Sequence, residues 1–473
     1  MSHAKGDSQK RQSSLLDAWF PAKRPRTEDK KTVEGGKLAD VASPSAKTGS
    51  SPSAKTSSLP STKTGTSGRS GTSGSTCTPR GTSGRSGSEA STRRDEAGKR
   101  PTGRPPPQRD DWFSKLFGFS EDGGYAETKR WLRVVDGPRI GLQSLESLAT
   151  GERFGCGHFS TPTLSELRSL GRKVRLPGKL RVTNELGDVG AKHAMKENRH
   201  AVFQAASQFN CLEFVGPSVR PEDGVAGYAM DRTQGPCCAI TCGPGTVFRN
   251  YFVPLDAQGL VAESSEKVVQ HGQTAKSQLQ NLADLGSLLC NEGHPPRLYE
   301  IKGGYTLASK QQLARFREAL KGIGDNDAAL SQIRIGVHDD CQVTSARWGR
   351  EQLRDAEQTV TQVYGSACSV AYNRQSSAAD WEVFSRLVLD ASYEATLWAA
   401  LLSAARHQTD GSRRVFLTCL GGGVFGNRME WIESAMDRAF TIFKDYNLDI
   451  RIVTYAGAID PRLKALQAKY CGK

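Results

Sequence analysis

The fold is decided by Val415-Phe416-Leu417-Thr418-Cys419-Leu420 followed by Gly421-Gly422-Gly423-Val424-Phe425-Gly426-Asn427. The apolar run predicts a buried strand. Apolar residues recur at spacings of three and four over 429–443, which predicts an amphipathic helix after the glycine run. Glycine lets backbone N–H groups approach phosphate oxygens, and a helix N-terminus favours an anion. The stretch therefore predicts a loop that holds a phosphate-bearing ligand.

Two other interpretations of this loop remain open. Gly421, Gly423 and Gly426 fit the pattern Gly-x-Gly-x-x-Gly of dinucleotide-binding domains. That family also needs further strand–helix units and an acidic residue closing the next strand, but the next strand here closes with Thr454-Tyr455-Ala456. The second interpretation is a tight turn that needs glycine only for its backbone conformation.

Strands and helices alternate through the rest of the chain from about residue 181. Amphipathic helices separate the short apolar runs, which predicts an α/β fold with a mostly parallel or mixed sheet and helices on both faces. The predicted strands are Ala201–Ala206, Leu298–Ile301, Ile333–Val337, Val363–Tyr372, Val415–Leu420 and Ile450–Tyr455.

Composition divides the 473 residues into three parts. Residues 1–110 are rich in Ser, Thr, Gly, Pro and basic residues and are predicted to form a disordered tail. Residues 111–180 are predicted to be an extension packed on the core, and residues 181–473 the α/β domain. Most of the net charge of +14 lies in the tail. The tail is thus suited either to a nucleic acid partner or simply to solubility and targeting.

The sequence predicts neither a metal site nor a membrane span. The 11 cysteines include no Cys-x-x-Cys pair, and Cys237, Cys238 and Cys242 fit no common zinc spacing, so buried thiols of an intracellular protein are expected. His338 beside Asp339 and Asp340 is interpreted as a polar strand end rather than a metal site. The longest apolar stretch is interrupted by acidic residues, so no membrane partner is expected.

An apolar island interrupts the basic tail near its start. Leu16, Trp19 and Phe20 have the spacing of an aliphatic residue followed three positions later by two aromatic residues. This island resembles the peptides that bind the sliding clamps of DNA replication, although the usual glutamine position holds Ser13. A basic cluster over 23–31 resembles a nuclear import signal, so we expect a nuclear protein. A chance apolar cluster is the alternative.

The ordered set of segments around the glycine loop resembles the macrodomain family, whose members bind ADP-ribose. In that family the loop at 421–427 wraps the diphosphate. The resemblance also covers Gly187-Asp188-Val189, Phe203–Ser207, Asp223–Ala229 and Lys302–Leu307. It implies a three-layer α/β/α fold with insertions and ADP-ribose as the ligand, with no further cofactor. The implied ligand-binding residues are Asp188, Gly224, Val225, Gly227, Gly421, Gly422, Gly423, Val424, Phe425, Gly426 and Asn427.

The residues with which macrodomain hydrolases act are changed here. Their asparagine falls at Ser207 and their loop aspartate at Ala226. Hydrolysis would need a carboxylate or a bound water beside the anomeric carbon, and Asn210 and Glu213 are the catalytic candidates. A turn residue and a surface carboxylate are the alternative interpretations.

Two hypotheses about function follow from these observations. The leading one is a nuclear ADP-ribose-binding protein, and its sharper form is an ADP-ribosyl hydrolase acting on modified protein or nucleic acid. The alternative is a non-enzymatic adaptor of chromatin or replication that acts through its tail.

Overall fold

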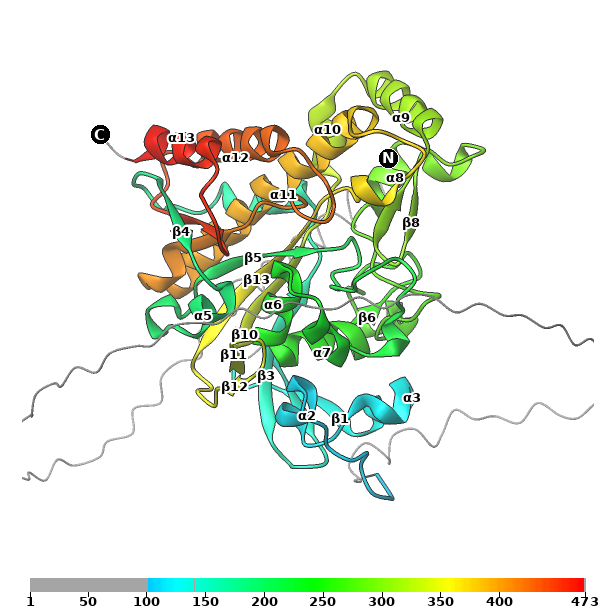
Figure 1. Cartoon of the computed structure of the whole chain (residues 1–473), viewed down its shortest axis with the longest axis vertical. Coiled ribbons are helices and arrows are strands. Elements are labelled where there is room, and N and C mark those ends of the chain that lie inside the picture. Colours follow the sequence, from blue (N-terminus) through cyan, green and yellow to red (C-terminus); the bar gives the residue numbers. More distant parts are fainter. Residues whose placement is uncertain (1–100, 140, 472–473) are drawn as a thin grey trace, which may run out of the picture. The chain divides into compact units, whose positions relative to one another are not determined.

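The computed structural model describes residues 101–139 and 141–471, and a nine-stranded sheet lies at their centre (Figure 1). In sheet order the strands are β1 (Leu132–Asp136), β2 (Gln143–Ser147), β3 (Arg153–Ser160), β10 (Gly336–Gln342), β13 (Thr359–Ser366), β5 (Val202–Ser207), β14 (Arg414–Leu417), β15 (Asp449–Thr454) and β4 (Arg181–Leu186).

The sheet is mixed, as the alternation of strands and helices predicted. Strands β13, β5, β14, β15 and β4 run parallel to one another. Strand β10 is antiparallel to both β13 and β3, and β1, β2 and β3 form an antiparallel meander. The segment at 111–180 therefore supplies three strands of the same sheet.

Helices cover both faces of the sheet. They are α2 (Trp112–Phe117), α3 (Gly124–Arg130), α4 (Leu164–Gly171), α5 (Val189–Ala194), α6 (Gln234–Thr241), α7 (Gly243–Tyr251), α8 (Ala283–Leu288), α9 (Lys310–Ile323), α10 (Asn326–Ser331), α11 (Ala378–His407), α12 (Met429–Phe443) and α13 (Pro461–Tyr470). Alternate residues of β14 point to opposite faces. Val415 and Leu417 join one hydrophobic cluster with α11 and α12, while Phe416 joins a second with α2, α6 and α7.

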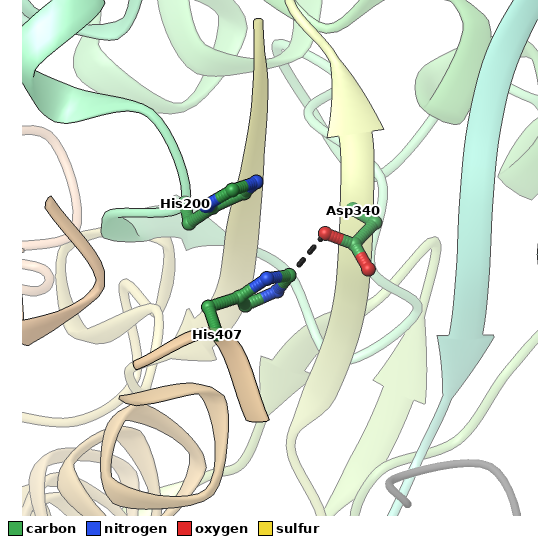
Figure 2. Close-up of side chains that lie close together, drawn as sticks. All are labelled: His200, Asp340 and His407. Carbon is green, nitrogen blue, oxygen red and sulfur yellow. Dashed lines mark ion pairs between the residues drawn. The ribbon is translucent and has the colours of Figure 1, made fainter. Parts of the chain in front are cut away.

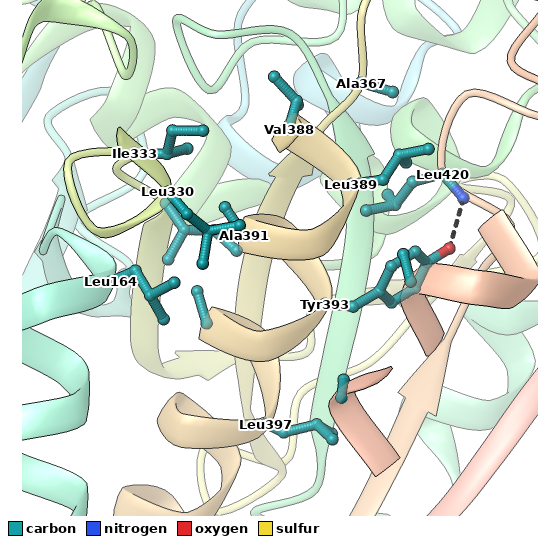
Figure 3. Close-up of a cluster of buried hydrophobic side chains, with 14 of the residues drawn as sticks. Leu164, Leu330, Ile333, Ala367, Val388, Leu389, Ala391, Tyr393, Leu397 and Leu420 are labelled. Atoms are coloured by element: carbon teal, nitrogen blue, oxygen red, sulfur yellow. Dashed lines mark hydrogen bonds between the residues drawn. The ribbon is translucent and has the colours of Figure 1, made fainter. Parts of the chain in front are cut away.

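Helix α11 is the central element of the first cluster. It spans 30 residues, begins with a capping box at Ser377, and buries side chains on all sides (Figure 3). Its buried Glu394 accepts hydrogen bonds from Arg168 of α4 and Arg438 of α12, so the charge is compensated. No helix in the described part of the chain is long and apolar enough to cross a membrane.

Three predicted strands differ strongly from the structure, and a fourth, Val415–Leu420, ends earlier than predicted, at Leu417. The run Val363–Tyr372 was predicted as one strand, but β13 ends at Ser366 and Val370–Tyr372 is a 3₁₀ turn. The run Ile333–Val337 enters β10 only at Gly336. The run Leu298–Ile301 overlaps only the start of a hairpin made of β8 (Glu300–Lys302) and β9 (Tyr305–Leu307). Apolar residues in these segments are buried beyond the strand ends, so hydrophobicity alone did not mark the boundaries.

Candidate functional site

A cavity of about 500 Å³ opens at the carboxyl ends of β5, β13 and β14. Ligands of α/β sheets bind at this edge, and the volume lies within the range of small-molecule sites. The cavity is lined by Ala206, Ser207, Gln208, Glu213, Phe214, Val215, Met230, Asp231, Arg232, Thr233, Gln234, Pro236, Tyr305, Gly365, Ala367, Tyr372, Thr418, Cys419, Leu420, Gly421, Gly423, Val424 and Phe425.

The glycine loop between β14 and α12 is fixed at both of its ends. At its start the Tyr393 hydroxyl of α11 donates to the Thr418 carbonyl (2.7 Å) and accepts from the Leu420 amide (3.0 Å; Figure 3). At its end the Asn427 side chain donates to the Cys368 carbonyl (2.8 Å), and its amide donates to the Gly421 carbonyl (2.9 Å). The loop is thus held in one shape before any ligand arrives.

Gly421 can be no other residue in this conformation. Its φ is +68°, and an added Cβ would lie 2.5 Å from both the Ala367 Cβ and the Asn427 Nδ2. Gly423 is different, since a Cβ there would meet nothing within 4 Å. Gly426 also has a positive φ, of +73°, so the loop contains two glycines that its backbone conformation requires and one, Gly423, that faces open space.

Four backbone amides of the loop have no protein acceptor within the described residues: those of Gly421, Gly423, Val424 and Phe425. They lie at the cavity wall, just before the N-terminus of α12. Clustered N–H groups without protein partners bind anions, and the helix N-terminus adds a favourable dipole. This wall is suited to phosphate oxygens.

Aromatic rings form another wall of the cavity. The Tyr305 centroid lies 4.9 Å from that of Tyr372 and 5.2 Å from that of Phe425. Tyr305 is placed by the β8–β9 hairpin, and its hydroxyl donates to the Phe214 carbonyl (2.6 Å). Such rings offer apolar surface and stacking faces to a nucleoside.

Two carboxylates line the cavity, Glu213 and Asp231, and Glu213 is 1% exposed. The Ser207 hydroxyl donates to its Oε1 (3.1 Å), while Oε2 lies 3.7 Å from Arg249 Nη2 and has no hydrogen-bond partner within the described residues. Burial raises the pKa of Glu213 to about 7, against the opposing effects of Arg249 and Ser207. The group can therefore hold or release a proton near neutral pH.

Arg249 supports Glu213 from beneath the cavity and is itself 0% exposed. Its Nε donates to the Cys211 carbonyl (3.0 Å), and its guanidinium lies 3.8 Å from the Tyr364 ring centroid. Its Nη1 is 3.2 Å from Nδ1 of His338. Burial, reinforced by Arg249, lowers the pKa of His338, so the neutral ring can accept this hydrogen bond. His338 is thus a core residue of β10, which differs from the polar strand end predicted.

The structure places some of the predicted residues at the cavity and others away from it. Gly421, Gly423, Val424, Phe425 and Glu213 line it. Gly422, Gly426 and Asn427 do not, although they shape the loop.

Asn210 also lies away from the cavity. Its Nδ2 donates to Gln278 Oε1 (2.8 Å), and its Oδ1 accepts from the Leu212 amide (3.1 Å). Asn210 is therefore a turn residue that positions the segment carrying Glu213.

The segment with Gly224, Val225 and Gly227 does not line the cavity either. The amides of Val225 (2.8 Å) and Ala226 (2.6 Å) both donate to Glu121 Oε2, from the segment between α2 and α3. A side chain of the N-terminal extension thus occupies the amide of Val225, a residue that the sequence assigned to the ligand, together with that of the neighbouring Ala226. No local sequence signal pairs these two segments.

Asp188 is the N-cap of α5. Its Oδ1 accepts from the Gly190 amide (2.8 Å) and from the thiol of Cys237 (3.4 Å). It does not line the cavity.

Some residues of the cavity were not predicted from the sequence, and one predicted site lies outside the described residues. Sequence reasoning did not identify Tyr372 or Arg232 as cavity residues, because their segments carry no motif of their own. The predicted clamp-binding peptide with Leu16, Trp19 and Phe20 lies outside the described residues.

No protein family and no curated protein matches the sequence. Among solved structures, a poly(ADP-ribose) glycohydrolase from Thermomonospora curvata is 14% identical, with 71% of this chain and 93% of that chain covered at a TM-score of 0.32. The poly(ADP-ribose) glycohydrolase from Deinococcus radiodurans in complex with ADP-ribose is 11% identical, with 66% of this chain and 93% of that chain covered at a TM-score of 0.33. TM-scores this low carry no inference about function.

Proposed function

We propose that the cavity binds an ADP-ribose unit, free or attached to a macromolecule. The observation that carries this proposal is a set of backbone amides, at Gly421, Gly423, Val424 and Phe425, that have no acceptor among the described residues and belong to the lining of the same cavity as an aromatic wall. The amides suit a diphosphate, and the rings suit the flat apolar face of a nucleoside. The resemblance of the glycine loop to that of macrodomains supports the same ligand.

The direct test is calorimetry on the full chain with ADP-ribose, AMP and NAD as separate ligands. ADP-ribose should bind with one site per chain and more tightly than AMP, which lacks the second phosphate and the second ribose. Tighter binding of NAD than of ADP-ribose would favour a dinucleotide-dependent enzyme instead. Absence of binding at millimolar ADP-ribose by folded protein would refute the proposal.

We propose further that the bound unit is hydrolysed and that Glu213 is the acid. The carboxyl would give its proton to the oxygen that leaves the anomeric carbon as that C–O bond breaks. Water would then bond to the anomeric carbon and return a proton to the carboxylate. A pKa near 7 suits both halves of this exchange. Burial beside Ser207 and Arg249 supports Glu213 over Asp231, the other carboxylate of the lining.

Glu213→Gln and Asp231→Asn form the matched pair for this step. If Glu213 is the acid, Glu213→Gln should lose at least ~100-fold in release of ADP-ribose from modified protein while still binding ADP-ribose. Asp231→Asn should retain most of the release. Release that is equal in wild type and Glu213→Gln, or absent from wild type that binds ADP-ribose, would leave a binding protein without this chemistry.

We propose a nuclear location and, as a second function, recruitment to a sliding clamp through Leu16, Trp19 and Phe20. The spacing of these side chains supports it. A peptide of residues 8–30 should retain the clamp in a pull-down, and the double variant Trp19→Ala, Phe20→Ala should not. The adaptor hypothesis would be refuted if both peptides retained the clamp equally. It would also be refuted if neither peptide retained the clamp. Binding of nucleic acid by the basic tail is tested separately, through the salt dependence of that binding.

A further inference from the structure

His200, Asp340 and His407 converge in space (Figure 2). They lie near the first residues of β5 and β13, at the opposite end of these strands from the cavity. His200 lies just before β5, Asp340 lies in β10, and His407 is the last residue of α11. Each offers one potential ligand atom, and these atoms all lie within 4.8 Å of one another. Since the cavity lies at the other end of β5, a strand of six residues, the two sites are about 20 Å apart.

Three backbone segments bring these side chains together. The His200 amide donates to the Thr359 carbonyl at the start of β13 (2.7 Å). Asp340 lies where the β10–β13 pairing shifts register, between His338 and Cys341. His407 closes a helix whose buried side chains run through the core. The cluster therefore joins three segments that are distant in the sequence.

The hydrogen bonding within the cluster is incomplete. Arg406 Nε donates to His407 Nε2 (3.3 Å), so this nitrogen offers a lone pair, yet Asp340 Oδ1 lies only 3.1 Å from it. Asp340 Oδ1 and His200 Nδ1 are buried atoms without a hydrogen-bond partner within the described residues. The His200 and His407 rings stack at 4.0 Å with an angle of 9° between their planes.

The lone pairs of Asp340 Oδ1 and His407 Nε2 face each other, so a proton or another cation is needed between these two atoms. Positive charge already lies near the carboxylate: Arg406, which also pairs with Asp339 (2.6 Å), attracts Asp340, and Arg139 Nη1 lies 3.9 Å from Asp340 Oδ2. The C-terminal end of α11 carries the negative end of the helix dipole, which favours a cation at this position. Either a proton on an imidazole or a metal ion would satisfy the cluster.

We propose that His200, Asp340 and His407 bind one divalent transition-metal ion, with Zn²⁺ the best match. Two imidazole nitrogens and one carboxylate oxygen form a ligand set that zinc accepts, and a fourth position stays open to water. Closing the site needs ligand atoms that lie up to 4.8 Å apart to approach by as much as about 1.5 Å, because bonds of about 2 Å separate tetrahedral ligands by about 3.3 Å. The two stacked imidazoles must also turn so that their in-plane lone pairs point at one ion. The ion would tie the end of α11 to β10 and to the start of β5. It would stabilise the fold and take no part in chemistry at the cavity.

The test uses the full chain, stripped with a chelator and titrated with Zn²⁺ or Co²⁺ alone. Wild type should take up one ion per chain, show the visible absorption of tetrahedral Co²⁺, and melt at a higher temperature with Zn²⁺ than without it. Asp340→Asn and His407→Ala should each bind Zn²⁺ at least tenfold more weakly and lose the Co²⁺ absorption. His271→Ala, which removes an exposed histidine, is the matched control and should behave as wild type.

Circular dichroism and cavity ligand binding of the variants show whether they fold. If Asp340→Asn does not fold, His200→Asn provides the second test of the site. Failure of folded wild type to bind Zn²⁺ would overturn the proposal in favour of a proton-bridged pair. Equal uptake by wild type and the site variants would place the ion on other residues, such as the cysteines, and would overturn it as well.

Discussion

Replacing Glu213 by glutamine should change how the stability of the protein depends on pH. Burial raises the pKa of the Glu213 carboxyl from 4.5 to about 7 in the folded protein. The folded state therefore holds this proton over a range in which the unfolded chain has lost it. Wild-type stability should fall as pH rises from 4.5 to about 7 and then remain flat as far as this group is concerned. Glutamine does not titrate, so the variant lacks this contribution.

The size of the effect follows from the pKa difference. One pKa unit corresponds to about 1.4 kcal/mol, so a shift from 4.5 to about 7 is worth about 3 kcal/mol. The free energy of unfolding of Glu213→Gln, relative to wild type, should therefore rise by about 3 kcal/mol between about pH 4.5 and about pH 8.5. The substitution also changes the interaction with Arg249, and the part of this change that does not depend on pH is present at both pH values. It therefore cancels when the difference in unfolding free energy at one pH is subtracted from that at the other.

Urea unfolding of the full chain, followed by near-ultraviolet circular dichroism at several pH values, measures this difference. Glu318→Gln is the matched control, since Glu318 has a side chain that is 71% exposed on α9. Its pH profile should parallel that of wild type. If Glu213→Gln also parallels wild type across this pH range, the carboxyl is not desolvated as the structure indicates. Its assignment as a proton donor near neutral pH would then fail.

Three other substitutions probe the site and the core. Gly235→Ala should destabilise the protein by about 2 kcal/mol or more in urea unfolding, because the new Cβ would lie 1.9 Å from the Ala206 carbonyl oxygen; unchanged stability would contradict that packing. Glu394→Gln should cost about 2–3 kcal/mol by the same measurement, since it removes the buried carboxylate that pairs with the partly buried Arg168, and a neutral outcome would show that the pair is solvated. Asn427→Ala should weaken ADP-ribose binding about tenfold in calorimetry by loosening the glycine loop, whereas undiminished affinity would show that the loop is held by other contacts.

The parts of the fold with strong local patterns could be predicted from the sequence. The strand at 415–420, the glycine loop and the helix at 429–443 lie where the apolar spacing indicated, with the strand ending at Leu417. The mixed sheet with helices on both faces also follows from the alternation of elements. The loop could be predicted because glycine conformation and a following helix are local properties.

The remainder of the site depends on contacts between distant segments. Glu121 binds the amides of Val225 and Ala226, and nothing in either segment predicts the other. Arg249 lies in a stretch of charged and aromatic residues, yet it is wholly buried because the Cys211 carbonyl and Glu213 compensate its charge. The same limit applies to the cluster around His407, whose members approach only when the sheet and α11 are assembled.

The binding of ADP-ribose to wild type and to Gly423→Glu, measured by calorimetry on the full chain, tests the central claim most directly. A Cβ added at position 423 meets no atom within 4 Å and the position is exposed, so the variant should fold and melt as wild type does. Its carboxylate would stand beside the unpaired amides and repel a diphosphate. We predict one site per chain in wild type and an affinity at least tenfold lower in Gly423→Glu. Equal affinities, or no binding by wild type at millimolar ADP-ribose, would contradict the assignment of the glycine loop as a diphosphate site.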